Sequence, residues 1–131
     1  MIVVDSSVWV ELLRGTHSPA HLRLRGLIES GAELAVTEMV LAETLAGSRR
    51  DQALATRRRL LAFPVLPLRG VRDYEAAAAL YRVCHEAGET IRSIADCLIA
   101  VPTIRARATL LHADRDFEKL ARHTPLEVLP V

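Results

Sequence analysis

Short apolar segments alternate along the chain with longer segments in which apolar residues recur every three or four positions. The short segments have the length and β-branched composition of strands, and the longer ones have the period of amphipathic helices. The expected strands cover residues 2–4, 34–36, 65–67, 109–111 and 126–129. The expected helices cover about residues 6–13, 19–29, 38–45, 51–62, 73–86, a stretch from 93 onward, and 116–122.

This alternation of strands and helices predicts an α/β fold. Because parallel strands are joined by helical crossovers, we expect a three-layer sandwich with a mostly parallel central sheet of about four to five short strands flanked by helices. We expect Pro102 to kink the helix that begins at Ser93, or to split it in two. The 131 residues, half of them hydrophobic, show no repeat or linker, so residues 1–131 are expected to form a single domain.

Composition limits the kinds of partner. The formal net charge is only +1, so a nucleic acid would have to be bound locally rather than by a strongly basic surface. No apolar run approaches the roughly 20 residues that cross a bilayer, and no export signal is visible, so we expect a cytoplasmic protein without membrane association. Cys84 and Cys97 form no C-x-x-C pair and are expected to be reduced and buried.

Two acidic residues directly follow predicted strands. Asp5 ends the segment IVVD, and Asp114 ends TLLHAD. In open parallel sheets, ligands gather outside the carboxyl ends of the strands, where loops and helix N-termini converge. We therefore expect these two carboxylates to lie at the same edge of the sheet.

Two further acids lie on apolar faces of predicted helices. Glu43 shares its face with Met39 and Val40, and Asp96 shares its face with Ile99. An unpaired buried carboxylate is costly, and one cation shared by all four acids would compensate them together. An all-carboxylate site suits Mg²⁺ or Mn²⁺, and the lack of a His or Cys cluster argues against zinc.

Each acid also has a simpler interpretation. Asp5 could cap the first helix and Asp116 the last, the segment from Ser93 to Asp96 matches a capping box, and Glu43 could be a partly exposed helix residue. Taken singly, each of these is the commoner case. Two strand-end acids together with two helix acids on apolar faces favour a single metal site.

Four segments carry a family resemblance. In order and spacing, the chain resembles the VapC-type PIN domains, which are ribonuclease toxins of type II toxin–antitoxin systems, along essentially its whole length. Two departures are Ser6, where a threonine is common in the family, and Pro102, where the family's helix usually continues without proline. The segments are MIVVDSSVWVELLRG, VTEMVLAETLAG, IRSIADCLIA and LLHADRDFEKLA.

This resemblance implies a divalent-metal-dependent endoribonuclease that uses Mg²⁺, or alternatively Mn²⁺. Asp5, Glu43, Asp96 and Asp114 correspond to the family's acidic quartet, and Asp116 to a further acid in its D-x-D-F segment. Asp5, Asp96 and Asp114 would hold metal, Glu43 would orient water or a second ion, and Asp116 would be an outer ligand or a helix cap. The implied partners are an RNA substrate, a VapB-like antitoxin and a second copy of the chain.

Two other function classes stay open. One is a non-catalytic module that binds RNA or protein on the same fold. The other is an aspartyl-phosphate phosphotransferase or hydrolase, which would need a lysine partner and, for the hydrolase, a D-x-D motif at the first strand. Here the triplet is Asp5-Ser6-Ser7 and Lys119 is the only lysine, which argues against that mechanism.

The remaining polar residues carry weaker expectations. Arg92 and Arg115 flank acidic positions and could contact RNA phosphates, although a surface role is equally plausible. Trp9 is expected in the core or at an interface. We expect solvated positions for Arg49, Arg50, Arg57, Arg58 and Arg59, surface positions for His17, His21, His85 and His123, and no ligand role for His112.

Overall fold

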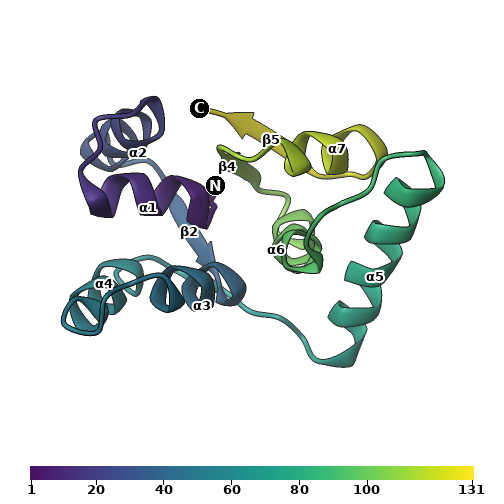
Figure 1. Cartoon of the computed structure of the whole chain (residues 1–131), viewed down its shortest axis with the longest axis horizontal. Coiled ribbons are helices and arrows are strands. Elements are labelled where there is room, and N and C mark those ends of the chain that lie inside the picture. Colours follow the sequence, from purple (N-terminus) through teal and green to yellow (C-terminus); the bar gives the residue numbers. More distant parts are fainter.

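The computed structural model describes residues 1–131 and contains one five-stranded sheet (Figure 1). The strand order is β3-β2-β1-β4-β5, and every neighbouring pair is parallel. The predicted α/β architecture is therefore confirmed. The strands are β1 (Ile2–Val4), β2 (Leu34–Thr37), β3 (Val65–Leu66), β4 (Thr109–His112) and β5 (Glu127–Pro130).

Seven helices surround the sheet, and most pack in pairs. Helix α1 packs on α2, α3 on α4, and α5 on α6. Figure 1 shows α1 to α4 grouped at one end of the molecule and α5 to α7 at the other. No helix is both long and apolar enough to cross a membrane. The helices are α1 (Ser6–Arg14), α2 (Pro19–Glu29), α3 (Glu38–Ala46), α4 (Ala53–Leu60), α5 (Val71–Glu86), α6 (Ile94–Arg105) and α7 (Arg115–His123).

Strand β1 lies at the centre of the sheet and fixes the position of the residues that follow it. Val3 pairs with Ala35 of β2 and with Leu110 of β4, and all three side chains are buried. The backbone amide of Asp5 donates to the carbonyl of Leu111 at 2.9 Å, which extends this pairing past the end of β1. The carboxyl ends of β1 and β4 are thus held side by side.

Helix α6 runs unbroken through Pro102, so of the two expected effects of the proline, a kink or a split, the split was wrong. All residues from Asp96 to Thr103 are buried, because α6 packs against α5, α3 and the sheet. Proline inside a helix costs about 3 kcal/mol, and the burial of eight successive residues outweighs that cost.

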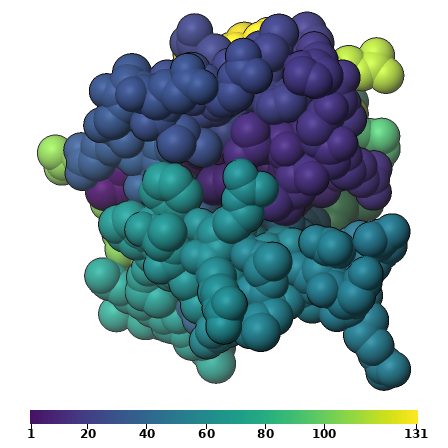
Figure 2. All heavy atoms as spheres, turned by 90° about the vertical axis from the view of Figure 1, so that its left-hand side faces the viewer, coloured from purple at the N-terminus to yellow at the C-terminus, as the bar shows by residue number.

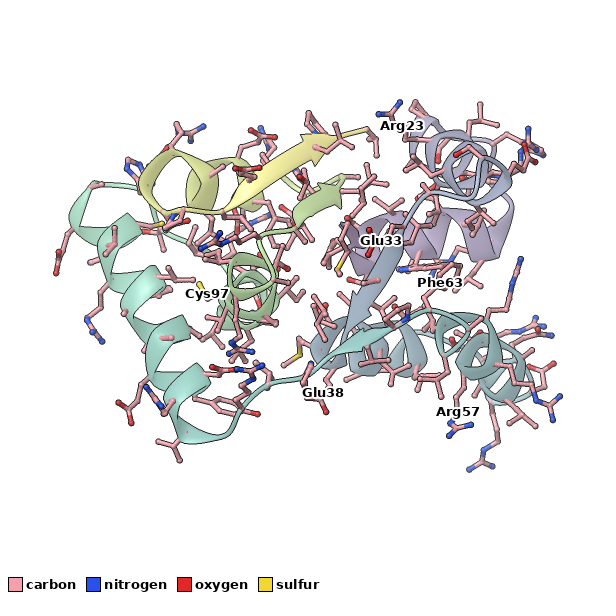
Figure 3. The ribbon with its side chains drawn as sticks, turned by 180° about the vertical axis from the view of Figure 1, so that it is seen from behind. Arg23, Glu33, Glu38, Arg57, Phe63 and Cys97 are labelled. Atoms are coloured by element: carbon pink, nitrogen blue, oxygen red, sulfur yellow. The ribbon has the colours of Figure 1, made fainter.

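Several side chains lie as the sequence indicates. Cys84 and Cys97 are free and buried, with Cys97 between α6 and α5 (Figure 3). Trp9 is buried, and its ring centroid lies 5.6 Å from that of Phe63. The surface position expected for His21 was wrong. Its side chain is buried because the turn before α2 folds over it, with Nδ1 accepting from the His17 amide at 2.8 Å.

The central position of β4 predicts a large cost for truncating Leu110, which is fully buried. We expect Leu110→Ala to lower the free energy of unfolding by about 2–5 kcal/mol, since it removes core contacts and leaves a cavity. Leu54→Ala removes the same atoms from a side chain that is 57% exposed, and should change stability by no more than about 0.5 kcal/mol. Urea unfolding followed by circular dichroism measures both, and equal losses would contradict this account of the core.

Candidate active site

The structure brings four of the five predicted acids into one pocket of about 610 Å³. The four arrive from different parts of the fold: the end of β1, the middle of α3, the first turn of α6 and the end of β4. The rest of the wall includes Ser6, Ser7, Glu11 and the start of α2. The four acids are Asp5, Glu43, Asp96 and Asp114.

Asp5 is buried and uses one carboxylate oxygen to cap α1. Its Oδ2 accepts from the Ser7 amide at 3.0 Å and from the Ser7 hydroxyl at 2.5 Å. The Ser7 Oγ also accepts from the Ala113 amide at 3.0 Å, which ties the start of α1 to the segment after β4. Burial raises the pKa of Asp5 above its ordinary value in spite of the hydrogen bonds from Ser7.

Glu43 reaches the pocket from α3 and is partly buried. Its Oε1 accepts from the Ser6 hydroxyl at 3.1 Å, so successive serines after Asp5 hold two different carboxylates. Burial raises the pKa of Glu43, and the negative charge of Asp5 raises it further.

Asp96 is the least compensated of the acids. It is 9% exposed, it accepts no hydrogen bond and it forms no ion pair. Ser93 caps α6 through the Ala95 amide at 3.2 Å rather than through the Asp96 amide, and the Asp96 side chain makes no bond back to Ser93, so the predicted capping box does not form. Burial raises the pKa of Asp96 to about 7, with the negative charges of Asp114 and Asp5 contributing in the same direction.

Asp114 lies at the edge of the pocket and caps α7, the role that the sequence suggested for Asp116. Its Oδ1 accepts from the Asp116 amide at 3.0 Å and from the Arg92 guanidinium at 2.8 Å. Its own amide donates to Nδ1 of buried His112 at 3.2 Å. Because Nδ1 accepts, Nε2 of a neutral His112 carries the proton and donates to Glu118 at 3.0 Å.

Asp116 does not line the pocket. It is 1% exposed, and its Oδ2 accepts from the Arg92 amide at 2.8 Å and from Arg92 Nε at 3.1 Å, while Lys119 Nζ lies 2.9 Å from Oδ1. Burial alone would raise the pKa of Asp116, but the hydrogen bonds from the Arg92 amide and Lys119 lower it below its ordinary value. Arg92 thus bridges Asp116 and Asp114.

The donor chemistry of the pocket fits a hard divalent cation. Five acidic residues line it, the four predicted acids and Glu11, and Arg92, which binds Asp114 at the rim, is the only cationic group that contacts any of them. No three acidic, His or Cys side chains form a ready-made ligand set, so the carboxylates would have to move closer to coordinate one ion. Lys119 contacts Asp116 and the Thr90 carbonyl and makes no contact with Asp5. An aspartyl-phosphate mechanism would need a lysine beside the nucleophilic aspartate, so this arrangement argues against it.

Sequence reasoning missed the residues that hold the acids in place. Ser6 and Ser7 could have been found, because two hydroxyls follow Asp5 at a helix start. Arg92 was expected to be a phosphate contact or a surface residue, and His112 was not expected to be a ligand. Their contacts to Asp114 depend on how α7 packs beside β4 and the loop before α6, which no local pattern encodes.

Residues 2–123 match the family model of the PIN domain, and the chain belongs to that family. It is 43% identical over 129 residues to the VapC ribonuclease Mb1587 of Mycobacterium bovis and to ribonuclease VapC11 of Mycobacterium tuberculosis. These alignments cover 97% of this chain and 96% of each relative, which confirms the resemblance to VapC-type PIN domains.

Solved structures show the same fold. VapBC2 of Rickettsia felis, bound to a DNA fragment from its promoter, aligns with a TM-score of 0.74 at 19% identity, covering 100% of this chain and 99% of that one. The VapBC-5 toxin–antitoxin system of Mycobacterium tuberculosis aligns with a TM-score of 0.68 at 25% identity, covering 98% and 97%.

The buried state of Asp96 predicts that the metal-free protein loses stability as pH rises. Between the ordinary pKa of 3.8 and about 7, the folded chain retains a proton on Asp96 that the unfolded chain has lost. Stability should therefore fall across this window, by on the order of 1–2 kcal/mol after allowance for solvent screening.

Urea unfolding in chelator at several pH values between 5 and 8.5 tests this, and Asp96→Asn should give a shallower profile with no loss of stability at the alkaline end. Asp51→Asn, which removes an exposed acid, is the matched control and should keep the wild-type slope. If the free energy of unfolding changes with pH equally in wild type and in Asp96→Asn, ionisation of Asp96 does not destabilise the folded protein and the prediction is wrong.

Proposed function

We propose that this protein is a divalent-metal-dependent endoribonuclease that hydrolyses RNA phosphodiesters and acts as the toxin of a toxin–antitoxin pair. The observation that carries the proposal is the pocket into which four distant segments each deliver a carboxylate. Asp96 there has no counter-charge within the protein, so the pocket is built for a cation supplied from outside.

The relatives support the activity and the partner. The Mycobacterium proteins at 43% identity are named as ribonucleases. The solved structures include toxin–antitoxin complexes from Rickettsia felis and Mycobacterium tuberculosis. By this similarity we assign the chain an RNA substrate, a VapB-like antitoxin and assembly as a homodimer.

Mg²⁺ or Mn²⁺ is the proposed ion, held by Asp5, Asp96 and Asp114. When bound, such a cation stabilises phosphate charge and lowers the pKa of a water molecule. The protein contributes the positions of its acids: Ser7 fixes Oδ2 of Asp5 at the wall of the pocket. Glu43, fixed by Ser6, is placed to orient the attacking water and to accept its proton.

We assign Asp116 a positioning role rather than a ligand role. Both of its oxygens are engaged by Arg92 and Lys119, and its side chain lies outside the acidic pocket. It holds Arg92, and the Arg92 guanidinium in turn holds Asp114. Asp116 therefore acts on the site through the orientation of Asp114.

Cleavage of single-stranded RNA should stop in excess chelator and return when Mg²⁺ or Mn²⁺ is added in excess. Asp96→Asn should lower the cleavage rate by at least about 100-fold, because it removes a charge that the cation requires. Glu75→Gln, which removes an exposed acid of α5 outside both pockets, should cleave at the wild-type rate. Gel analysis of a labelled RNA measures all three, and full cleavage in chelator would exclude the metal-dependent mechanism.

Thermal melting during Mn²⁺ titration separates ligand from positioning residues. A ligand that binds only the folded state stabilises it by about 2.7 kcal/mol at a concentration 100 times its Kd. We expect Mn²⁺ to raise the Tm of wild type and of Asp116→Asn, but not of Asp5→Asn. Without metal, Asp116→Asn should melt below wild type, because it leaves Arg92 and Lys119 without their counter-charge.

The same titration addresses the non-catalytic alternative. A module that only binds RNA or protein would show no Mn²⁺-dependent stabilisation in the wild type. Loss of the Mn²⁺ response in Asp116→Asn would instead make Asp116 a ligand and overturn its positioning role.

A further inference from the structure

A second hollow, of about 600 Å³, lies between α1, α4 and the loop that joins α3 to α4. Figure 2 shows the face on which the purple spheres of α1 meet the blue-teal spheres of α4. Its size is that of a ligand site, about 300–1,000 Å³. Every charged residue that lines it is an arginine: Arg14 at the end of α1, Arg49 in the loop and Arg59 at the end of α4.

These arginines have few partners of their own. Arg49 reaches Asp51 at 3.4 Å, and both side chains are exposed. Arg14 and Arg59 make no ion pair or hydrogen bond with the protein. A position in the last turn of a helix favours a cation through the helix dipole, and this accounts for arginine at the ends of α1 and α4. It does not account for guanidinium groups from three separate segments around one hollow.

Hydroxyl groups also line the hollow, and one of them is an unused donor. Thr44 is 2% exposed, and its Oγ1 is buried without any hydrogen-bond partner. The Ser48 hydroxyl donates to the Thr44 carbonyl at 2.8 Å, and the Thr56 hydroxyl lies 3.4 Å from Ser48 Oγ. Gln52 also lines the hollow. Arginine, amide and hydroxyl donors without a single lining carboxylate form a site for an anion.

The hollow and the acidic pocket share one lining residue, Val10 of α1. Val10 lines both, with Ser6 and Ser7 on the acidic side and Leu13 and Arg14 on the basic side. At a rise of about 1.5 Å per residue, the ends of α1 lie roughly 12 Å apart, which a short run of single-stranded nucleic acid can cover. Phosphates recur along such a strand. A strand whose scissile phosphate lies in the acidic pocket can therefore place another phosphate in the arginine-lined hollow.

We propose that the hollow lined by Arg14, Arg49 and Arg59 is a phosphate subsite, which holds the backbone of single-stranded RNA at a phosphate away from the bond that is cleaved. This inference rests on the proposed function. It explains how a chain of net charge +1 binds a polyanion beside four carboxylates: the attraction is concentrated at one end of α1 and the acids at the other.

RNA binding by matched arginine variants tests the proposal. All proteins carry Asp96→Asn and are kept in chelator, so that binding is measured without cleavage. Arg57 is the control, since it lies on α4 two residues before Arg59, does not line the hollow and extends away from α1 (Figure 3). Arg59→Gln and Arg57→Gln change the net charge equally.

Fluorescence anisotropy of a labelled single-stranded RNA should show about three- to tenfold weaker binding for Arg59→Gln and for Arg14→Gln, and little change for Arg57→Gln. In Arg59→Gln and Arg14→Gln only, the slope of log Kd against log salt concentration should decrease by about 0.7 for each phosphate contact that is lost. Equal losses for Arg59→Gln and Arg57→Gln would overturn the proposal, because they would show a diffuse charge effect.

An acidic protein segment is the competing occupant. If Arg59→Gln binds RNA as well as its parent but binds the proposed antitoxin more weakly, the hollow serves a protein and the RNA proposal is wrong. Cleavage by protein with an intact Asp96 reports separately on the proposed function. If that protein cleaves no RNA while the Arg59 effect on binding remains, the nuclease assignment fails and the phosphate subsite stands.

Discussion

Repulsion among carboxylates is the constraint around which this structure is organised. Ionised acids in a partly buried pocket disfavour one another, and burial removes the water that would otherwise stabilise them. Burial raises the pKa of Asp96 to about 7, and the negative charges of Asp114 and Asp5 contribute in the same direction. The acids stay together because the backbone leaves them no alternative: the ends of β1 and β4 are joined by the Asp5 amide to the Leu111 carbonyl and by the Ala113 amide to Ser7. Apolar burial in the sheet and in α6 therefore maintains an electrostatic arrangement that is unfavourable on its own.

Helix capping and membership of the acidic pocket are compatible in this protein. Asp5 gives Oδ2 to the first turn of α1, and Asp114 gives Oδ1 to the first turn of α7. In each case the second oxygen has no protein donor. Capping also fixes the orientation of the carboxylate. The acid can accept a hydrogen bond from the amide two residues further along the chain in only a few side-chain conformations. The simpler interpretation of these residues as caps therefore describes how they are oriented.

The parts of the structure that could be predicted from sequence are those fixed by local pattern. The strand ends at Asp5 and Asp114 follow from short apolar runs, and the inward orientation of Asp96 follows from helical periodicity. Pro102 shows where local rules fail, since a propensity penalty is small beside the burial of a central helix. The N-cap of α7 is Asp114 rather than the expected Asp116. Both residues suit that position, and the point at which β4 ends decides between them. Arg92 and His112 act across the tertiary structure, and no spacing in the chain indicates their contacts with Asp114.

The arginine-lined hollow is a second feature that local sequence pattern does not predict. In sequence, Arg49, Arg50, Arg57, Arg58 and Arg59 form one basic group with the appearance of a solvated surface. In the structure, α4 turns Arg59 toward the end of α1 while Arg57 extends away from it, so neighbouring residues of one type have different surroundings. Arg14 joins from α1, which also supplies Ser6 and Ser7 at its opposite end. Two sites of opposite charge thus lie at the two ends of one helix. Since interactions between exposed charges are screened beyond about 8–10 Å at ordinary ionic strength, each end of α1 acts on its own ligand atoms with little cancellation by the other.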